Sequence, residues 1–432
     1  MKDFCIRALF ICFYALPLLI SVKADTLSLK NYVVLSLKNS PQYTLAVSSV
    51  DASRASRQTM LSKLLPSVNG NAGLSRFESS GSSSRLTGPD VNSASANISG
   101  QVLLWDFGKS PLQYKASEKS VTASEFDLRE SVASIILNAR TAYFNYLLST
   151  QLLIVNEDAL KQAQEHYTQA QTLFDVGKQA KIAVTNASVD VANAQVNVIH
   201  ARNTVKLAKV QLETVAASKI GEPLMLSDSL NVLEDSIGEN EAEKRALGSR
   251  SQILSVKTRL ESAKLQLKAA QASFFPSLNA SAGFGWDAQD IGTIVGSDWN
   301  TSPNWNIGAN LSIPLYEGGA ISAQVAQAKA AVMQSQAQLD VVTLSVVQQV
   351  QQFYLQEFDA RQRINATAVV IQQAGENLEL TQERYKAGLG TSVDLTDAEQ
   401  TLANARSSHV QALFDYRIAH ANLLLAIGEL KE

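Results

Sequence analysis

The sequence is poor in cysteine, proline and glycine. Its 432 residues include 2 cysteines, 9 prolines and 21 glycines. Two cysteines exclude a disulfide framework, and so few prolines and glycines favour long uninterrupted elements over a loop-rich fold. The 37 basic and 40 acidic residues nearly balance, so we predict no nucleic-acid partner. A hydrophobic content of 46% excludes wholesale disorder.

The first 24 residues have the pattern of a secretory signal peptide. Lys2 and Arg7 precede an apolar run over residues 8–22, and Ala24 supplies the small residue expected at a cleavage site. The run is short for a membrane anchor. Removal of residues 1–24 would remove both cysteines. No later stretch has the length of a transmembrane helix, so we expect an exported protein that could cross a membrane only with strands.

The rest of the chain is an internal duplication. The segment that begins Leu64-Leu-Pro-Ser matches the one that begins Phe274-Phe-Pro-Ser. At nearly the same offset, Leu104-Trp-Asp-Phe-Gly matches Leu315-Tyr-Glu-Gly-Gly. We therefore predict two structural repeats, 25–221 and 241–432, joined by an acidic segment at 222–240 near the middle of the molecule.

Each repeat is predicted to contain a helix, two strands and two long helices. The strands are expected at about 67–77, 96–105, 277–286 and 304–316, and the long helices at about 109–175, 180–219, 320–386 and 391–428. One apolar series recurs at alternating spacings of four and three, with Ser335 and Gln349 at the two positions that are not apolar. This spacing is typical of a coiled-coil seam: Ile321, Val325, Ala328, Val332, Leu339, Val342, Val346 and Phe353. Helices of this length cannot bury their seams in a compact globule, so we expect a long bundle or tube.

The strand segments alternate between apolar and polar residues, which gives each strand two chemically different faces. This pattern is typical of a half-buried sheet and also of a membrane barrel, whose strands carry aromatics on the lipid side. In the barrel interpretation Phe284, Trp286 and Trp305 face lipid. Four strands cannot close around a pore, and an open edge is costly in lipid. Several chains would have to share one barrel, and three would supply twelve strands.

These features, in order and doubled, resemble the outer-membrane efflux protein family, the TolC-like channel-tunnels of Gram-negative bacteria. The resemblance rests on Phe-Pro-Ser-Leu at 275–278, Leu-Tyr-Glu-Gly-Gly at 315–319, and Tyr385-x-x-Gly388 before Ser392-Val-Asp-Leu. It implies a mixed α/β membrane protein: a homotrimer with a twelve-stranded outer-membrane β-barrel, four strands per chain, continued by an α-helical barrel. It also implies outer-membrane lipid, a periplasmic adaptor and an inner-membrane pump or ABC transporter as partners. The chain would then be a passive exit duct for efflux or type I secretion.

Two aspartates are candidate pore residues. Asp394 and Asp397 lie one helical turn apart and would share a face. The resemblance implies a ring of such carboxylates at the periplasmic entrance, which would attract cations and raise some carboxylate pKa values. Helix capping is a second, compatible interpretation, because Thr391-x-x-Asp394 has the form of a capping box.

The turns between the long helices are candidate docking sites. Gly177 and Gly388 are expected to be left-handed helix caps. The resemblance implies that these tips, with Gly390, contact the adaptor. Some members of the family carry a polar residue and an arginine that latch the entrance, whereas this chain has Ala183 and Gly390. We therefore expect closure to depend on other contacts.

Nothing in the sequence favours catalysis. Gly108-Lys109-Ser110 lacks the earlier glycine of a phosphate-binding loop. The four histidines show no ligand spacing and are expected on helix surfaces or interfaces: His166, His200, His409 and His420. We predict no catalytic, cofactor-binding or metal-binding residue, and no enzyme. Two alternatives remain: a periplasmic coiled-coil adaptor or scaffold without a pore, and an adhesin-like or surface-layer protein with a coiled-coil stalk.

Overall fold

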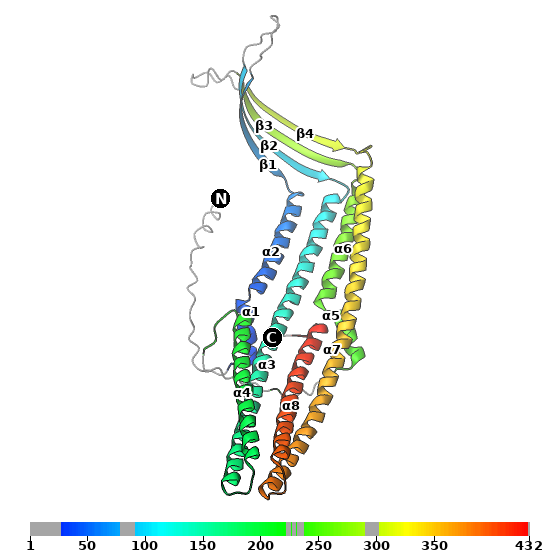
Figure 1. Ribbon diagram of the computed structural model, residues 1–432. Coiled ribbons are helices and arrows are strands. Elements are labelled where there is room, and N and C mark those ends of the chain that lie inside the picture. Colours follow the sequence, from blue (N-terminus) through cyan, green and yellow to red (C-terminus); the bar gives the residue numbers. More distant parts are fainter. Residues whose placement is uncertain are drawn as a thin grey trace.

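The computed structural model describes residues 27–77, 91–221, 226, 230, 237–289 and 302–430. The predicted signal peptide and most of the predicted joint lie outside these residues. The described part of the chain is elongated, with a sheet at one end and the turns of two helical hairpins at the other (Figure 1). None of the helices in this part has a stretch apolar enough to serve as a transmembrane span.

The two halves have the same order of elements. The first consists of α1 (Leu29–Asn39), α2 (Pro41–Ser62), β1 (Ser67–Phe77), β2 (Val91–Trp105), α3 (Lys109–Asp175) and α4 (Lys181–Ala216). The second consists of α5 (Glu239–Ser249), α6 (Ser251–Ala272), β3 (Ser277–Gln289), β4 (Ser302–Ser312), α7 (Ala320–Lys386) and α8 (Ser392–Ala426). The corresponding helices α3 and α7 both contain 67 residues.

Several boundaries differ from the predicted ones. Each half has two helices before its strands, not one, because Ser40 and Arg250 adopt extended conformations. In the first half the Ser40 side chain accepts a hydrogen bond from the amide of Tyr43, at 3.3 Å, and starts a new helix. Pro41 follows this break in the first half, whereas no proline lies beside the corresponding break at Arg250 in the second half. Helix α5 begins within the predicted joint, β2 begins five residues earlier than expected, and β4 ends at Ser312.

The four strands form one antiparallel sheet in the order β1-β2-β3-β4. Its register places apolar residues or glycine opposite one another on one face, as in the row Gly70, Ile98, Phe284, Trp305. Small polar residues or glycine line up on the other face, as in the row Asn69, Ser99, Gly283, Asn306. Most described side chains of both faces are solvent-accessible in the single chain. The alternation predicted along each strand therefore continues across all four strands and gives the sheet one apolar and one polar face.

A β-bulge in β2 interrupts that alternation. The register of β2 slips between Leu103 and Trp105, so Trp105 rather than Leu104 pairs with Leu278 in the apolar rows. The Trp105 ring stacks on Phe107, with centroids 4.1 Å apart, and Phe107 stacks on Phe275 at 4.9 Å. This stack lies at the corner where the sheet continues into the helices.

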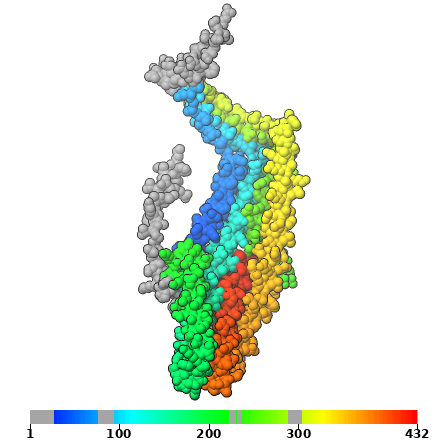
Figure 2. All heavy atoms as spheres, in the orientation of Figure 1, coloured from blue at the N-terminus to red at the C-terminus, as the bar shows by residue number. Residues whose placement is uncertain are grey.

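The helices form one layer below the sheet. Next to the strands the helix order is α2, α3, α6, α7, and near the hairpin turns it is α4, α3, α8, α7 (Figure 1). The short helices α1 and α5 pack beside α3 and α7 at the middle of the molecule. Figure 2 shows the two hairpins side by side at the end far from the sheet, in green and in orange to red. In such a layer a helix has neighbours on two sides only.

The predicted seam of α7 is confirmed. Val342 and Val346 are buried with Val350 in a cluster that includes Ala246 of α5 and Ile427. The other predicted seam residues are half-buried, while most of their neighbours on α7 are exposed. The apolar stripe thus faces the adjoining helices rather than solvent.

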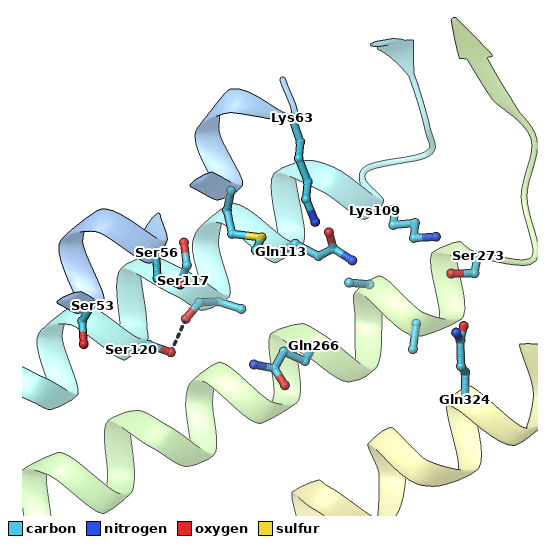
Figure 3. Close-up of a pocket in the computed structure, with 14 residues that line it drawn as sticks. Ser53, Ser56, Lys63, Lys109, Gln113, Ser117, Ser120, Gln266, Ser273 and Gln324 are labelled. Carbon is cyan, nitrogen blue, oxygen red and sulfur yellow. Dashed lines mark hydrogen bonds between the residues drawn. The ribbon is translucent and has the colours of Figure 1, made fainter. Parts of the chain in front are cut away.

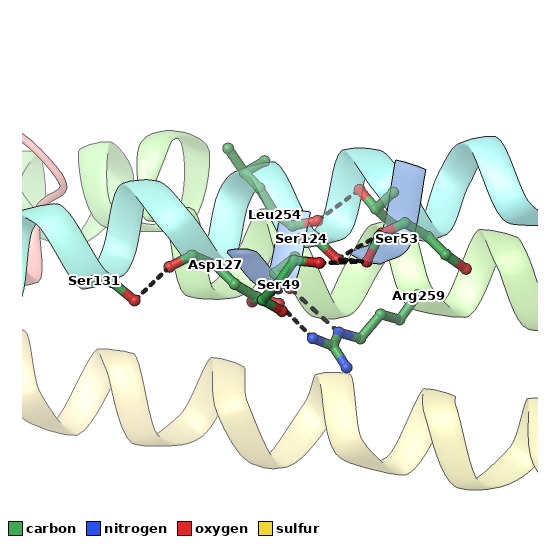
Figure 4. Close-up of polar contacts among 10 residues, drawn as sticks. Ser49, Ser53, Ser124, Asp127, Ser131, Leu254 and Arg259 are labelled. Atoms are coloured by element: carbon green, nitrogen blue, oxygen red, sulfur yellow. Dashed lines mark hydrogen bonds and ion pairs between the residues drawn. The ribbon is translucent and has the colours of Figure 1, made fainter. Parts of the chain in front are cut away.

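Polar contacts join the layer near its middle. The hydroxyls of Ser53 on α2 and Ser124 on α3 are 2.8 Å apart (Figure 4). Asp127 on α3 accepts a hydrogen bond of 2.6 Å from the hydroxyl of Ser255 on α6, and it forms an ion pair with Arg259. Serines and alanines along these helices allow the backbones to approach closely.

A buried ion pair lies at the break between α5 and α6. The Arg250 guanidinium is 2.7 Å from the Glu130 carboxylate of α3, and it donates a hydrogen bond to the carbonyl oxygen of Leu425 in α8. Burial lowers the pKa of Arg250. Burial raises the pKa of Glu130, and the charge of Arg250 opposes that shift. The Arg250 side chain, at the start of α6, thus connects α6 to α3 and α8.

We predict that Arg250→Met lowers the free energy of unfolding by about 3 kcal/mol, because it leaves the Glu130 carboxylate unpaired. The double variant Arg250→Met/Glu130→Met should recover most of that loss. Urea unfolding followed by helical circular dichroism measures both. A double variant as unstable as the single one would contradict the importance of the charge pair.

Candidate functional site

The hairpin turns at the end far from the sheet are built alike. Gly177 and Gly388 both have φ of +75°, a conformation that favours glycine. In each turn a backbone amide reaches back to the last helical turn: Lys178 to the carbonyl of Leu173, and Leu389 to that of Arg384, both at 2.8 Å. The predicted left-handed caps are confirmed.

Gly390 and Ala183 have packing roles in the single chain. A Cβ atom at Gly390 would lie 3.3 Å from the backbone nitrogen of Tyr385, so the turn wraps closely over the end of α7. Ala183 is buried. Neither residue brings a polar side chain to the tip, so a latch built on these two positions would lack its polar groups.

Asp394 caps helix α8. The Thr391 hydroxyl accepts a hydrogen bond from the Asp394 amide at 3.1 Å, and the Asp394 carboxylate accepts one from the Thr391 amide at 3.0 Å. The capping box is confirmed. Hydrogen bonds to the carboxylate from the Thr391 amide and from the Thr391 side chain, with a smaller contribution from the charge of Arg384, lower the pKa of Asp394. Within one chain the pKa shift is therefore opposite to the rise expected in a crowded ring.

Both candidate aspartates line one groove. Asp394 and Asp397 are exposed and border a hollow of ≈ 350 Å³ between the ends of α7 and α8. Arg384 and Gly390 border the same hollow. The chain thus presents two carboxylates on one surface directly beside a hairpin turn.

A second polar cluster lies between the two hairpins. His166 of α3 is only 2% exposed. Its Nε2 is 3.3 Å from the hydroxyl of Ser392, and its Nδ1 is 4.0 Å from the Glu399 carboxylate. The imidazole also contacts the Tyr385 ring edge-on, with centroids 5.3 Å apart. One histidine therefore touches both helices of the second hairpin.

Acidic groups gather beside this histidine. Asp190 of α4 accepts a hydrogen bond of 3.0 Å from the hydroxyl of Thr396, and it lines a hollow of ≈ 170 Å³ with Glu399. Burial, and then the charges of Asp190 and Glu165, raise the pKa of Glu399 to about 7. Burial lowers the pKa of His166, and Asp190 opposes that shift. Two titratable side chains with shifted pKa values therefore lie next to each other.

A pattern in the sequence of α8 marks this cluster. Ser392, Thr396 and Glu399 lie at helical spacing on one face of α8. Polar residues along a helix face that packs against two other helices would have marked the site. Two further histidines also lie at helix interfaces: His409, 2.9 Å from the Thr367 hydroxyl, and His420, 3.1 Å from the Glu357 carboxylate.

The three candidate aromatics share the apolar face of the sheet. Phe284 pairs with Trp305 across β3 and β4, and Trp286 follows two positions along the same strand. The rings of Phe284 and Trp286 meet edge-on at 4.6 Å. Trp305 is 75% exposed. An apolar surface with large exposed aromatics is unusual for a sheet surrounded by water.

A larger hollow of ≈ 530 Å³ lies near the sheet and is lined by α2, α3, α6 and α7 (Figure 3). Lys63 and Lys109 lie at the end nearest the strands, and most of the remaining lining consists of serine, glutamine and alanine. Its lining contains no carboxylate or imidazole for acid–base chemistry. Over the described ranges, no group of three or more potential ligands is placed to hold a metal ion.

Comparison with known proteins agrees with this geometry. The chain is 27% identical over 365 residues to the outer membrane efflux protein BepC of Brucella suis, covering 84% of this chain and 77% of that protein. It is 24% identical over 432 residues to the alkaline protease secretion protein AprF of Pseudomonas aeruginosa, covering 97% and 88%. The solved Campylobacter jejuni CmeC outer membrane channel has the same fold, with a TM-score of 0.81 at 23% identity over 94% of this chain and 86% of that chain.

The family model for outer membrane efflux proteins matches residues 33–218 and 243–429, one segment in each half. These two segments cover most of the chain and contain all four strands and the four long helices. The resemblance seen in the sequence is therefore confirmed, and the chain belongs to the outer membrane efflux protein family.

Proposed function

We propose that three copies of this chain form an exit duct that spans the outer membrane and continues across the periplasm. Four strands from each copy would form a twelve-stranded barrel, and the helices would form a tube below it. The duct is passive: it guides cargo and performs no chemistry. Export would require removal of residues 1–24 as a signal peptide.

The two-faced open sheet is the observation that carries this proposal. The apolar face, with Phe284, Trp286 and Trp305, suits the hydrocarbon of a membrane, and the polar face suits a water-filled lumen. The outer strands β1 and β4 each have one edge without a partner strand in the described sheet. In lipid such edges cost several kcal/mol per unpaired group, so they favour closure by further copies.

The helical layer is open in the same way. Its edge helix α4 exposes apolar residues at heptad positions, namely Ile182, Val189, Val196 and Val210, with Asn203 at the position between the last two. The opposite edge helix α7 exposes apolar residues at twice that spacing, namely Val341, Leu355 and Val369. Two such stripes at opposite edges of one layer suit packing of α4 from one copy against α7 of the next. A closed ring would cover both stripes and pair β1 with β4.

The hairpin tips are the proposed docking end. The turns at Gly177 and Gly388, with Gly390, would contact a periplasmic adaptor, and cargo would come from an inner-membrane pump or ABC transporter. BepC is named as an efflux protein and AprF as a secretion protein, so both efflux and type I secretion fit this chain. A coiled-coil adaptor or scaffold without a pore does not account for the exposed apolar face of the sheet.

Single-channel recording tests the proposed duct. We expect the detergent-purified protein to give uniform conductance steps in a planar bilayer, with block by a trivalent cation added on the side of the hairpin tips. Asp394→Asn/Asp397→Asn should weaken that block by about tenfold or more, because the carboxylates that concentrate cations are lost.

The asparagine side chains keep the capping acceptors, and Glu376→Gln on the exposed surface of α7 is the matched control. Conductance steps without any cation block would refute the carboxylate ring but would still support the proposed channel. The absence of steps at both pH 6 and pH 8 from a preparation that is demonstrably oligomeric would refute the duct.

A pair of neighbouring substitutions tests which face of the sheet meets lipid. Ile307 is 76% exposed on the apolar face, and Ile307→Arg should cost about 2–4 kcal/mol of membrane stability. Gly308→Arg lies at nearly the same depth on the polar face, with open space around the added side chain, and should be tolerated. Recovery of folded protein in the outer-membrane fraction measures both. Equal loss for the two variants would contradict the assignment of faces.

A further inference from the structure

Near the tips, polar side chains connect the two hairpins. From the first hairpin, among the described residues, only Leu173 joins the apolar cluster that packs α7 against α8 there. The polar contacts at this level include those of His166 with Ser392 and Glu399, and that of Asp190 with Thr396. The contacts between the two hairpins therefore include side chains whose charge depends on pH.

Carboxylates outnumber cationic groups at this contact. The titratable groups that face one another are Glu165 and His166 from α3, Asp190 from α4, Tyr385 from α7 and Glu399 from α8. Arg406, further along α8, is paired with Asp158 of α3 instead, at 3.6 Å. An ionised Glu399 would therefore face Asp190 and Glu165 with only His166 as a potential counter-charge.

His166 does not supply that counter-charge with good geometry. Its Nδ1 is buried and has no hydrogen-bond partner. The distance of 4.0 Å to the Glu399 carboxylate is too long for a hydrogen bond. The Glu399 side chain is 13% exposed and Asp190 is half-buried, so water screens the repulsion between these two carboxylates weakly. Glu165 is exposed, and its charge is the smallest of the causes that raise the pKa of Glu399.

We propose that Glu399 is a proton-controlled clasp between the two hairpins. With its proton, Glu399 lets α8 lie against α3 and α4; without it, repulsion from Asp190 and Glu165 loosens α8 and its turn. The loosening of this contact does not require a pore. Only the further step, in which the loosening widens the entrance of a pore, rests on the proposed function.

The direction of the pH dependence follows from the raised pKa of Glu399. A carboxyl whose pKa rises from 4.5 to about 7 in the closed state stabilises that state fully below pH 4.5. This stabilisation falls as the pH rises and is lost above about pH 7. His166 acts in the opposite sense, because its lowered pKa favours the closed state above pH 6.5 and disfavours it below.

The net effect between pH 6 and pH 8 is a looser clasp at the higher pH. Linkage with an opened state of ordinary pKa predicts about a tenfold increase in opening from Glu399, opposed by about fourfold at most from His166. We therefore expect local opening to increase by about twofold to tenfold.

Hydrogen exchange measured by mass spectrometry on the detergent-purified full chain tests the clasp. After correction for the intrinsic pH dependence of exchange, amides of residues 392–405 should open about twofold to tenfold more often at pH 8 than at pH 6. Glu399→Gln keeps the shape but cannot ionise, so its opening should not increase between the two pH values. Glu379→Gln, an exposed glutamate of α7, is the matched control and should behave like the wild type.

A wild-type protein without this pH difference, or a Glu399→Gln variant that keeps it, would overturn the clasp. If Glu399→Gln does not fold, Asp190→Asn provides a second variant: it removes one repelling charge and should reduce the difference. Bilayer recording separates the two proposals. A pH response in exchange without conductance steps would refute the duct and leave the clasp, whereas conductance steps without a pH response in exchange would refute the clasp and leave the duct.

Discussion

A single layer of strands and helices cannot cover its own edges. In this chain the layer runs from β1 and α2 on one side to β4 and α7 on the other, and both sides present groups that call for a partner. At the sheet these are unpaired backbone groups of the edge strands, and along the helices they are apolar stripes on α4 and α7. The apolar and polar faces of the sheet, the length of the helices and the small side chains between them all fit closure by further copies.

The duplication gives the layer its regular construction. Because α3 and α7 have the same length, the two hairpin turns lie at the same end of the molecule, opposite the sheet (Figure 1). Each turn uses a glycine with the same φ, and each corner between sheet and helix uses residues of positive φ. The halves differ where function is expected to differ: Asp394 caps the second hairpin, while the corresponding position of the first hairpin is the buried Ala183.

Sequence patterns predicted the parts of the fold that depend on periodicity. Alternation predicted the two faces of the sheet, the four-and-three spacing predicted the seam of α7, and Thr391-x-x-Asp394 predicted the cap of α8. The bulge at Leu103 was missed because strict alternation assumes a constant register. The break at Arg250 was missed because no proline marks it, although Gly248 precedes it; there the extended Arg250 forms a buried ion pair with Glu130, which lies far away in the sequence. The His166–Glu399 contact joins segments far apart in the chain, so no local pattern contains it.

The number of copies in the assembled protein tests the central claim most directly. Native mass spectrometry of the detergent-extracted protein counts the chains in each particle. A layer with two open edges and four strands per chain predicts a single species of three copies, with β1 of one copy next to β4 of another. A stable, folded monomer with its sheet edges unpaired would contradict the account.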